Sequence, residues 1–230
     1  MKIAIIGAMD EEVALLKENI SGVSEETRAN VKLFIGKMFG HDVVLLKSGI
    51  GKVNAALATA IAIERFQPDL LINTGSAGGL NQNLSVGDIV VSTEVRHHDV
   101  DATAFGYEYG QVPQMPTSFI ADQKLVDLAY RCAEEIPGVK TVKGMIATGD
   151  SFMSDPRKVA RVSENFRDVA AVEMEGAAIA QVAYQYGIPF VVIRSLSDIA
   201  GKDSARSFEE FLQTAAENSA TLIMKMLERM

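Results

Sequence analysis

The sequence predicts an α/β fold of three layers, in which a mixed, mainly parallel central sheet is flanked by helices, in a single domain spanning residues 1–230. Short apolar runs alternate with segments of helical period from one end of the chain to the other. The runs 31–37 and 43–47 flank a turn at 39–42 and predict a hairpin inserted early in the chain. Ligands of such folds bind beyond the carboxyl ends of the strands, so we expect the functional site there.

Each predicted element follows from local patterning. The apolar runs that predict strands are 2–8, 31–37, 43–47, 70–73, 88–94, 141–147 and 190–194. The segments of helical period are 11–19, 53–67, 122–135, a segment opening at Asp155-Pro156, 175–187 and a C-terminal segment. Asp155 can cap a helix that has Pro156 in its first turn, and Gly187 is typical of a helix end. Ser207-Phe208-Glu209-Glu210 has the form of a capping box, so we expect the C-terminal helix to open there.

Composition and charge exclude several classes of function. The chain is 48% hydrophobic and 23% charged, as globular proteins are, and no apolar run is long enough to cross a membrane. A net charge of -8 argues against a nucleic-acid partner, which requires a basic face. The single cysteine, Cys132, excludes an intrachain disulfide. Together with the lack of a secretory apolar segment at the N-terminus, it predicts a cytoplasmic protein.

Residues 97–118 form a long stretch without periodicity, rich in glycine, tyrosine and proline. A loop of this length in a compact domain is usually functional or lies at an interface. Its Phe105, Tyr107 and Tyr109 could form a stacking wall, or could pack an ordered loop or a subunit contact. The segment from His97 to Asp101 contains residue types that bind metals, but adjacent residues rarely converge on one ion, so we expect no metal.

Carboxylates follow three predicted strands. Glu173 and Glu175 lie inside the otherwise apolar run 170–180, where a buried carboxylate requires a partner. Asp198 follows the strand 190–194, and Asp10-Glu11-Glu12 follows the first strand. We therefore expect one pocket lined with carboxylates. Two structural interpretations remain open: ion pairs of these acids with Arg194 or Lys202, and support of a helix N-terminus by Asp10-Glu11-Glu12.

Two glycine-rich segments also follow predicted strands. The segment from Thr74 to Gly79 would provide a tight turn, and its backbone amides could approach a ligand closely. Ser48-Gly49-Ile50-Gly51-Lys52 superficially matches nucleotide-binding loops. However, Val53 stands where a P-loop requires Ser or Thr, and Asn54 stands where the dinucleotide fingerprint requires Gly. We expect neither a triphosphate nor a dinucleotide there.

In combination, these segments resemble the 5'-methylthioadenosine/S-adenosylhomocysteine nucleosidase family of the nucleoside phosphorylase superfold. The resemblance runs through nearly the whole chain and rests on Gly7-Ala8-Met9, Ser48 to Val53, Asn73 to Gly78, Asp101 to Gln111, Ser151-Phe152, Val172 to Glu175 and Ser197-Asp198. It implies hydrolysis of the bond between adenine N9 and ribose C1' in a small adenine thionucleoside. No metal, organic cofactor, nucleic acid or membrane is implied. The implied setting is methionine salvage and removal of methyl-cycle by-products, with 5'-deoxyadenosine as a further candidate substrate.

The resemblance also implies roles for residues at the reacting bond. Asp198 resembles the general acid that delivers a proton toward adenine N7, and Glu12 resembles the base that positions the attacking water. Glu175 resembles the acceptor for the ribose hydroxyls. Four more residues would lie beside the water and the sugar: Ser76, Arg194, Glu173 and Met174.

Further implied roles concern the two ends of the substrate. Phe152 would stack on the purine, and the backbone of Met153 would bond its edge. Three apolar residues would line the slot for the 5'-thio group: Met9, Ile50 and Phe208. Phe105 and Pro113 would reach that slot from a neighbouring subunit, which implies a homodimer whose 102–113 loop completes the neighbouring site.

The chemistry agrees with these roles. Adenine leaves poorly until N7 is protonated, and carboxylates stabilise a ribosyl cation-like state. A phosphorylase is the nearest alternative, but the acids at 10–12 would repel a phosphate. A non-catalytic nucleoside-binding protein would not require both an acid and a base. The chain departs from the family at Gly176, where Ala is usual, and at Ala102, where a larger apolar residue is common.

Overall fold

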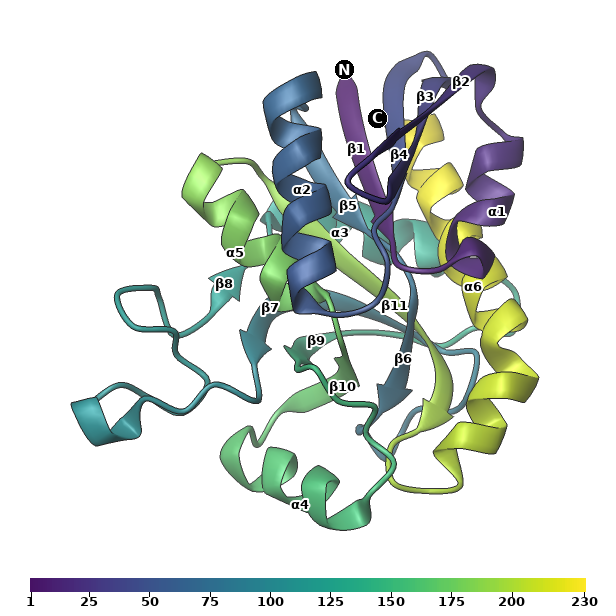
Figure 1. Cartoon of the computed structure of the whole chain (residues 1–230). Helices are drawn as coiled ribbons and strands as arrows, with labels where there is room; N and C mark the ends of the chain where they lie inside the picture. Colours follow the sequence, from purple (N-terminus) through teal and green to yellow (C-terminus); the bar gives the residue numbers. More distant parts are fainter.

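The computed structural model describes residues 1–230 and has the three-layer α/β architecture predicted from the sequence (Figure 1). Its strands are β1 (Lys2–Gly7), β2 (Ser21–Arg28), β3 (Val31–Met38), β4 (His41–Lys47), β5 (Leu70–Asn73), β6 (Ser76–Gly79), β7 (Ile89–His97), β8 (Phe119–Ile120), β9 (Thr141–Thr148), β10 (Val169–Glu173) and β11 (Phe190–Ile199). Its helices are α1 (Asp10–Glu18), α2 (Lys52–Phe66), the short 3-10 helix η1 (Thr103–Phe105), α3 (Gln123–Ala133), α4 (Pro156–Asn165), α5 (Gly176–Tyr186) and α6 (Ser204–Arg229). None of the helices combines the length and apolar character that a membrane crossing needs.

All strands join one 11-stranded sheet in the order β2-β3-β4-β1-β5-β11-β6-β10-β9-β7-β8. The pairings from β4 through β1, β5 and β11 to β6 are parallel, while the hairpins and the β6–β10 pair are antiparallel. β11 pairs with β7 as well as with β5 and β6, so the second half of the sheet curls back on itself. The sheet is therefore mixed, with its parallel pairings at the centre.

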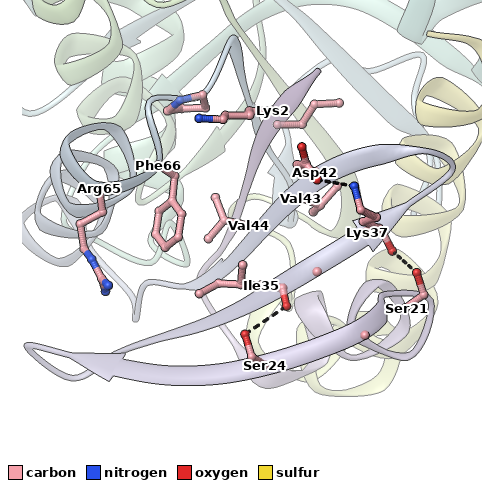
Figure 2. A pocket seen from close by; sticks show the side chains of 14 residues that line it. Lys2, Ser21, Ser24, Ile35, Lys37, Asp42, Val43, Val44, Arg65 and Phe66 are labelled. Atoms are coloured by element: carbon pink, nitrogen blue, oxygen red, sulfur yellow. Dashed lines mark hydrogen bonds and ion pairs between the residues drawn. The ribbon is translucent and has the colours of Figure 1, made fainter.

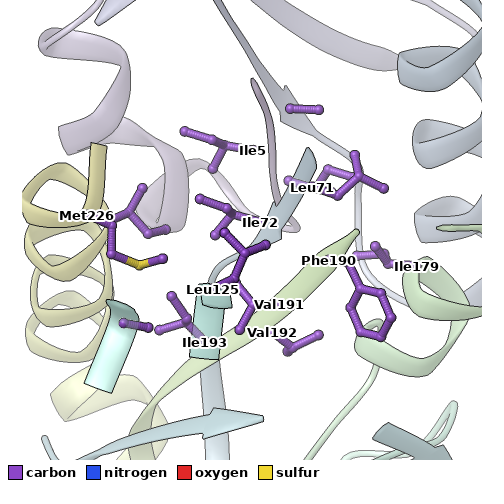
Figure 3. Close-up of a cluster of buried hydrophobic side chains, with 14 of the residues drawn as sticks. Ile5, Leu71, Ile72, Leu125, Ile179, Phe190, Val191, Val192, Ile193 and Met226 are labelled. Atoms are coloured by element: carbon purple, nitrogen blue, oxygen red, sulfur yellow. The ribbon is translucent and has the colours of Figure 1, made fainter. Parts of the chain in front are cut away.

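The core lies on both faces of the central strands. α2 and α5 pack together over one face, and α1, α3 and α6 pack over the other (Figure 1). β5 and β10 are buried along their whole length, which explains their apolar runs without alternation. Figure 3 shows side chains of β1, β5 and β11 between these layers, among them Ile5, Leu71, Ile72, Val191 and Ile193, together with Leu125 of α3, Met226 of α6 and Ile179 of α5.

Two predictions made at the strand ends are wrong in a way that affects the site. The segment predicted as a glycine-rich turn continues as β6, because Ser76 to Gly79 pairs with both β11 and β10. β11 does not end at Arg194 but runs to Ile199, so Asp198 lies within a strand rather than after one. In both places pairing with a neighbouring strand outweighs the local preference of glycine and serine for turns.

Two further differences lie at the edges of the fold. The sequence analysis missed β2, a polar strand at the sheet edge that is exposed along nearly its whole length and shows no apolar alternation. The predicted capping box does not open α6, which begins at Ser204. The Ser207 hydroxyl instead donates a hydrogen bond of 3.0 Å to the Ser197 carbonyl of β11, and this contact joins the first turns of α6 to the strand that carries Asp198.

A cavity of about 530 Å³ opens at the amino ends of β1 and β4 (Figure 2). Two of its cations are paired: Lys37 Nζ donates to Asp42 Oδ1 at 2.7 Å, and Arg65 Nη1 donates to Glu26 Oε2 at 2.7 Å. None of the site residues predicted from the sequence lines it. The acid-bearing turns lie at the opposite end of the strands, and we place the candidate site there.

Candidate active site

A second cavity, of about 490 Å³, lies at the carboxyl ends of β1, β5, β10 and β11, beside the first turns of α6. Ten of the residues predicted from the sequence line it: Met9, Glu12, Ile50, Ser76, Phe152, Glu173, Met174, Glu175, Asp198 and Phe208. Met153 lines a small adjoining hollow that it shares with Phe152 and Asp198. Strand ends that are far apart in sequence therefore meet at one site, as the α/β topology requires.

Glu12 is a firmly held carboxylate of this cavity, with only 2% of its surface exposed. Its Oε2 accepts hydrogen bonds from the backbone of Ala8 at 2.8 Å and of Met9 at 3.3 Å. Its Oε1 accepts from the amide of Ser76 at 2.9 Å and from the Ser76 hydroxyl at 3.1 Å. The first pair closes the N-terminus of α1, so the helix-supporting interpretation is correct. The second pair ties the same side chain to β6 inside the cavity.

Gly75 makes this arrangement possible. Its φ is +152, and a Cβ at this position would collide with the guanidinium of Arg194 and would lie 2.6 Å from Glu12 Oε1. Only glycine therefore lets the chain pass between the two charged groups.

A buried ion cluster supports the floor of the cavity. Arg194 is completely buried, and its Nη2 donates to Glu173 Oε2, to Asn73 Oδ1 at 2.8 Å and to Glu175 Oε2 at 3.5 Å. Its Nη1 donates to the Thr74 carbonyl at 3.2 Å. The alternative interpretation of an ion pair with Arg194 is thus confirmed, whereas Lys202 forms no ion pair with these acids.

The Glu173 carboxylate forms all of its hydrogen bonds within the protein. Besides Arg194, it accepts from the Thr148 hydroxyl and from the amides of Glu175 at 2.9 Å and Gly176 at 2.7 Å. A Cβ at Gly176 would lie 3.1 Å from Glu173 Oε1, so glycine leaves this carboxylate more room than alanine would. The side chain fixes the turn that leads from β10 into α5, and with it the backbone of Met174 at the cavity wall.

Glu175 has fewer partners. Its Oε1 accepts from the Gly51 amide at 2.8 Å, and its Oε2 lies 3.5 Å from Arg194 Nη2. Burial raises the pKa of Glu175 to about 8, against the lowering effect of Arg194, and the charges of Glu173 and Glu12 raise it further. The raised pKa favours the protonated form of this carboxyl, whereas groups that donate hydrogen bonds to it would favour its charged form.

Asp198 lies at another part of the cavity with a single hydrogen-bond donor. Its Oδ1 accepts from the Ser197 hydroxyl at 3.0 Å. Burial raises the pKa of Asp198 to about 6, although the hydrogen bond from Ser197 lowers it. A carboxyl group in this environment exchanges a proton near neutral pH, which is what general acid catalysis requires.

Aromatic and backbone groups lie beside Asp198. Phe152 and Phe208 form an edge-to-face pair with ring centroids 5.6 Å apart. Met153 accepts a hydrogen bond from the Gly201 amide at 3.0 Å, and its own N–H donates to no group of the protein. This end of the cavity therefore offers a flat apolar face, one backbone donor and one carboxyl group to a planar heterocycle.

Phe105 and Pro113 do not line the cavity of their own chain. They lie on the predicted 97–118 loop, which projects away from the body of the molecule (Figure 1). Phe105 is 84% exposed. Tyr109 packs against Phe166 at 5.9 Å and donates its hydroxyl to the His98 carbonyl at 3.0 Å, so it packs an ordered loop rather than forming a stacking wall.

His97 and Asp99, at the start of this loop, have hydrogen-bond partners within the protein. His97 Nε2 is bonded to Gln181 Oε1 at 3.0 Å, and Asp99 accepts from Lys52 Nζ at 2.6 Å. No group of three or more His, Cys, Asp or Glu side chains in the chain is arranged to hold a metal ion.

The sequence analysis missed three residues of the site. Ala205 and Glu209 line the cavity from α6, and Ala205 lies three positions before Phe208 and four before Glu209, as neighbours on one helical face do. Thr148 pairs in register with Glu173 at the ends of β9 and β10. A polar residue at a strand end was a usable signal for Thr148, while Ala205 and Glu209 were hidden by the misplaced start of α6.

Comparisons with known proteins agree with this geometry. Residues 2–228 match the family model described as the phosphorylase superfamily. The 5'-methylthioadenosine/S-adenosylhomocysteine nucleosidases of Bacillus thuringiensis (strain Al Hakam) and Bacillus anthracis are each 57% identical over 230 residues, with 100% of both chains covered.

Solved structures are similar over the same length. The 5'-methylthioadenosine/S-adenosylhomocysteine nucleosidase from Colwellia psychrerythraea 34H, in complex with adenine, has a TM-score of 0.97 and 56% identity, covering 99% of this chain and 94% of that chain. The enzyme of this name from Neisseria meningitidis, in complex with methylthio-immucillin-A, has a TM-score of 0.98 and 47% identity, covering 100% and 99%.

Proposed function

The chain belongs to the 5'-methylthioadenosine/S-adenosylhomocysteine nucleosidase family of the phosphorylase superfamily, and from this membership we propose the reaction that its cavity performs. The protein hydrolyses the N-glycosidic bond of 5'-methylthioadenosine and S-adenosylhomocysteine, releasing adenine and the 5-thioribose product. One observation supports this reaction above the others: the same cavity contains a carboxyl group suited to donate a proton, Asp198, and a firmly held carboxylate, Glu12. The protein acts in methionine salvage and in removal of methyl-cycle by-products.

Asp198 activates the leaving group. The purine lies against Phe152, with its edge on the free N–H of Met153, which brings N7 toward the Asp198 carboxyl. A proton passes from Asp198 to N7, and the electrons of the C1'–N9 bond then move into a neutral adenine. The raised pKa of Asp198, about 6, supports this role because the group can be protonated near neutral pH.

Glu12 positions the nucleophile. Of the four hydrogen bonds that Glu12 accepts, the one from the Met9 amide to Oε2 is the longest, at 3.3 Å. Oε2 therefore has the lone pair that is most freely available to a water molecule. The water attacks C1' of the ribosyl cation-like state from the side opposite adenine and loses a proton to the carboxylate. Arg194 lies beneath the site and keeps Glu173 and Glu175 from repelling each other.

Glu175 binds the sugar. Its Oε2 has only the long contact with Arg194, so it can accept hydrogen bonds from the ribose hydroxyls. Those donors favour its charged form, and the resulting carboxylate stabilises the cationic sugar in the transition state. Met174 lies beside it at the cavity wall.

An apolar slot receives the 5'-substituent. Met9, Ile50 and Phe208 line the cavity away from the polar floor. A thioether and its alkyl group gain free energy on leaving water for such a slot. The phosphorylase alternative is less well supported, because no lysine or arginine lines the cavity to receive a phosphate.

The 102–113 loop completes the site of a second copy. Phe105 is exposed, and neither it nor Pro113 reaches the cavity of its own chain. Val53 on α2 is also exposed, at 78%, which gives the face around α2 an apolar character suited to a homodimer. Phe105→Ala should raise KM for 5'-methylthioadenosine by about tenfold. A mass measurement by light scattering should show a dimer; a monomer with full activity would contradict this proposal.

The substrate assignment is tested by chromatography of products after the protein is mixed with 5'-methylthioadenosine, with and without phosphate. Adenine and free methylthioribose in phosphate-free buffer are the expected products. Formation of a sugar 1-phosphate only when phosphate is present would make the protein a phosphorylase and would overturn the role of Glu12. A cytoplasmic location is part of the same proposal and agrees with a chain whose single cysteine is free and buried.

A further inference from the structure

We propose that Lys52, Asp99 and Asp150 form a positioning clasp that holds three segments of the active-site wall in register. The clasp acts through the position of Glu175 and of the purine-binding loop, so it affects substrate binding more than chemistry. The inference rests on the proposed nucleosidase function. None of the three residues lines the cavity.

The three residues form a closed ring of contacts. The Lys52 amide donates to Asp150 Oδ1 at 2.8 Å, and the Asp150 amide donates to Asp99 Oδ2 at 2.9 Å. Lys52 Nζ then donates to Asp99 Oδ1 at 2.6 Å. Every carboxylate of the ring accepts from the backbone of another segment, so the ring fixes main-chain positions and not only side chains.

Each segment of the ring carries part of the site. Lys52 is the first residue of α2 and follows Ile50 and Gly51. Ile50 lines the cavity, and the Gly51 amide donates to Glu175 Oε1 at 2.8 Å. Asp150 lies two residues before Phe152 on the loop between β9 and α4. Asp99 lies at the root of the 102–113 loop, just after β7.

The contact at Gly51 is close enough to transmit a displacement. Gly51 has a φ of +95, and a Cβ at this position would lie 3.0 Å from Asp150 Oδ1. The Asp150 carboxylate therefore rests directly against the backbone that presents its amide to Glu175. A shift of Asp150 would move that amide and leave Glu175 without its backbone donor.

The charged pair of the ring is well shielded. The side chains of Lys52 and Asp99 are 19% and 29% exposed. Burial alone would raise the pKa of Asp99, but the hydrogen bonds from Lys52 and from the Asp150 amide bring it below its usual value. Burial lowers the pKa of the neighbouring His98, and Lys52 is the side chain that forms an ion pair with Asp99.

Another ion pair of the chain provides a matched comparison. Lys143 Nζ donates to Asp127 Oδ1 at the same 2.6 Å, and it joins β9 to α3 away from the cavity. A lysine that only stabilises the fold would behave like Lys143. A lysine that positions the active-site wall would change substrate binding as well.

The experiment compares Lys52→Met, Lys52→Arg and Lys143→Met in the full chain, with steady-state kinetics on 5'-methylthioadenosine and calorimetric titration with adenine. Lys52→Met should raise KM and the Kd for adenine by about tenfold, with kcat within about threefold of the parent. Lys52→Arg should restore most of both constants, because it keeps a donor for Asp99. Lys143→Met should leave both constants unchanged.

Non-additivity provides a second test. Asp99→Asn, combined with Lys52→Met, should add little to the effect of Lys52→Met, since both changes break the same ring. Equal KM in the parent and Lys52→Met, an equal rise in Lys143→Met, or a fall of kcat without a change in KM would overturn the clasp. Absence of turnover in the parent would overturn the proposed function instead, and the adenine titrations would still test the clasp. If Lys52→Met fails to fold, Asp99→Asn and Lys52→Arg carry the same comparison.

Discussion

The two carboxylates that the proposed reaction requires are held in opposite ways within one cavity. Glu12 accepts four hydrogen bonds, three of them from backbone amides. Asp198 accepts one, from the hydroxyl of Ser197, and burial raises its pKa to about 6. The difference shows how one residue class serves two functions: the surroundings either fix a negative charge in place or leave a proton to be transferred.

Glu175 lies between these extremes. It has one backbone donor and a long contact with Arg194, and burial raises its pKa to about 8. Its neighbour Glu173, two residues away, accepts four hydrogen bonds and pairs directly with Arg194. For these two neighbouring glutamates, the number of donors that reach the carboxylate thus separates Glu173, which supports the site, from Glu175, which remains available to substrate.

The largest expected effect is on turnover, at the weakly held carboxylate Asp198. Asp198→Asn keeps an acceptor for Ser197 but has no proton to donate, so kcat should fall by roughly 10²–10⁴-fold. Because only one hydroxyl must adapt, the melting temperature and the Kd for adenine should remain close to those of the parent. Steady-state kinetics, thermal unfolding and adenine titration measure the three quantities. Near-normal turnover would remove Asp198 from its role.

Substitution of the firmly held carboxylate Glu12 should reduce stability as well as turnover. Glu12→Gln places an amide NH₂ against backbone donors of Ala8 and Met9 or against Ser76, so one set of hydrogen bonds is lost. Turnover should fall by roughly 10²–10³-fold, and the free energy of unfolding should fall by about 1–3 kcal/mol. Denaturant unfolding of both variants makes the comparison. Equal stability of Glu12→Gln and Asp198→Asn would show that the four donors do not distinguish the two sites.

The acids of the site could be predicted from the sequence because each follows an apolar run, and parallel strands bring such positions to one edge. The roles of Glu173 and Glu175 could not be separated in this way. They lie two residues apart in one apolar segment. Arg194 on β11 and Thr148 on β9 both donate hydrogen bonds to Glu173, and only the folded structure shows that these donors reach Glu173 rather than Glu175.

The sequence also failed to predict elements whose strand pairing overrides the local conformational preference of their residues. Ser76 to Gly79 has the composition of a turn and becomes a strand because β10 and β11 both bond to it. The polar β2 carries no burial pattern, since it lies at the sheet edge. Likewise, the sequence marks 97–118 as a loop, but nothing in the local pattern shows which surface its exposed Phe105 contacts.

Substitution of Glu175 should have the smallest effect on the reaction. It tests whether this carboxylate is intermediate between Glu12 and Asp198. Its pKa is raised from 4.5 to about 8 in the folded protein, so the folded state binds this proton more tightly than the unfolded chain does. The stabilisation from the protonated form is fully present below the unfolded value and is lost as the pH rises through about 8. Glu175→Gln imitates the protonated form and still accepts from Gly51.

The variant should therefore lie within about 1 kcal/mol of the parent in stability at about pH 5 and exceed it by about 4 kcal/mol at about pH 8, or roughly 8–16 °C in melting temperature. It should also bind 5'-methylthioadenosine more weakly and lose most of its discrimination against a 2'-deoxy analogue, because its NH₂ meets the ribose hydroxyls as a donor. Glu209→Gln, at an exposed position of the same cavity, controls for the loss of one negative charge. A stability difference that does not change with pH would show that Glu175 is ionised in the folded protein without added ligand. In that case the contrast between Glu12 and Asp198 would stand without an intermediate, and Glu175 would bind the sugar as a preformed carboxylate.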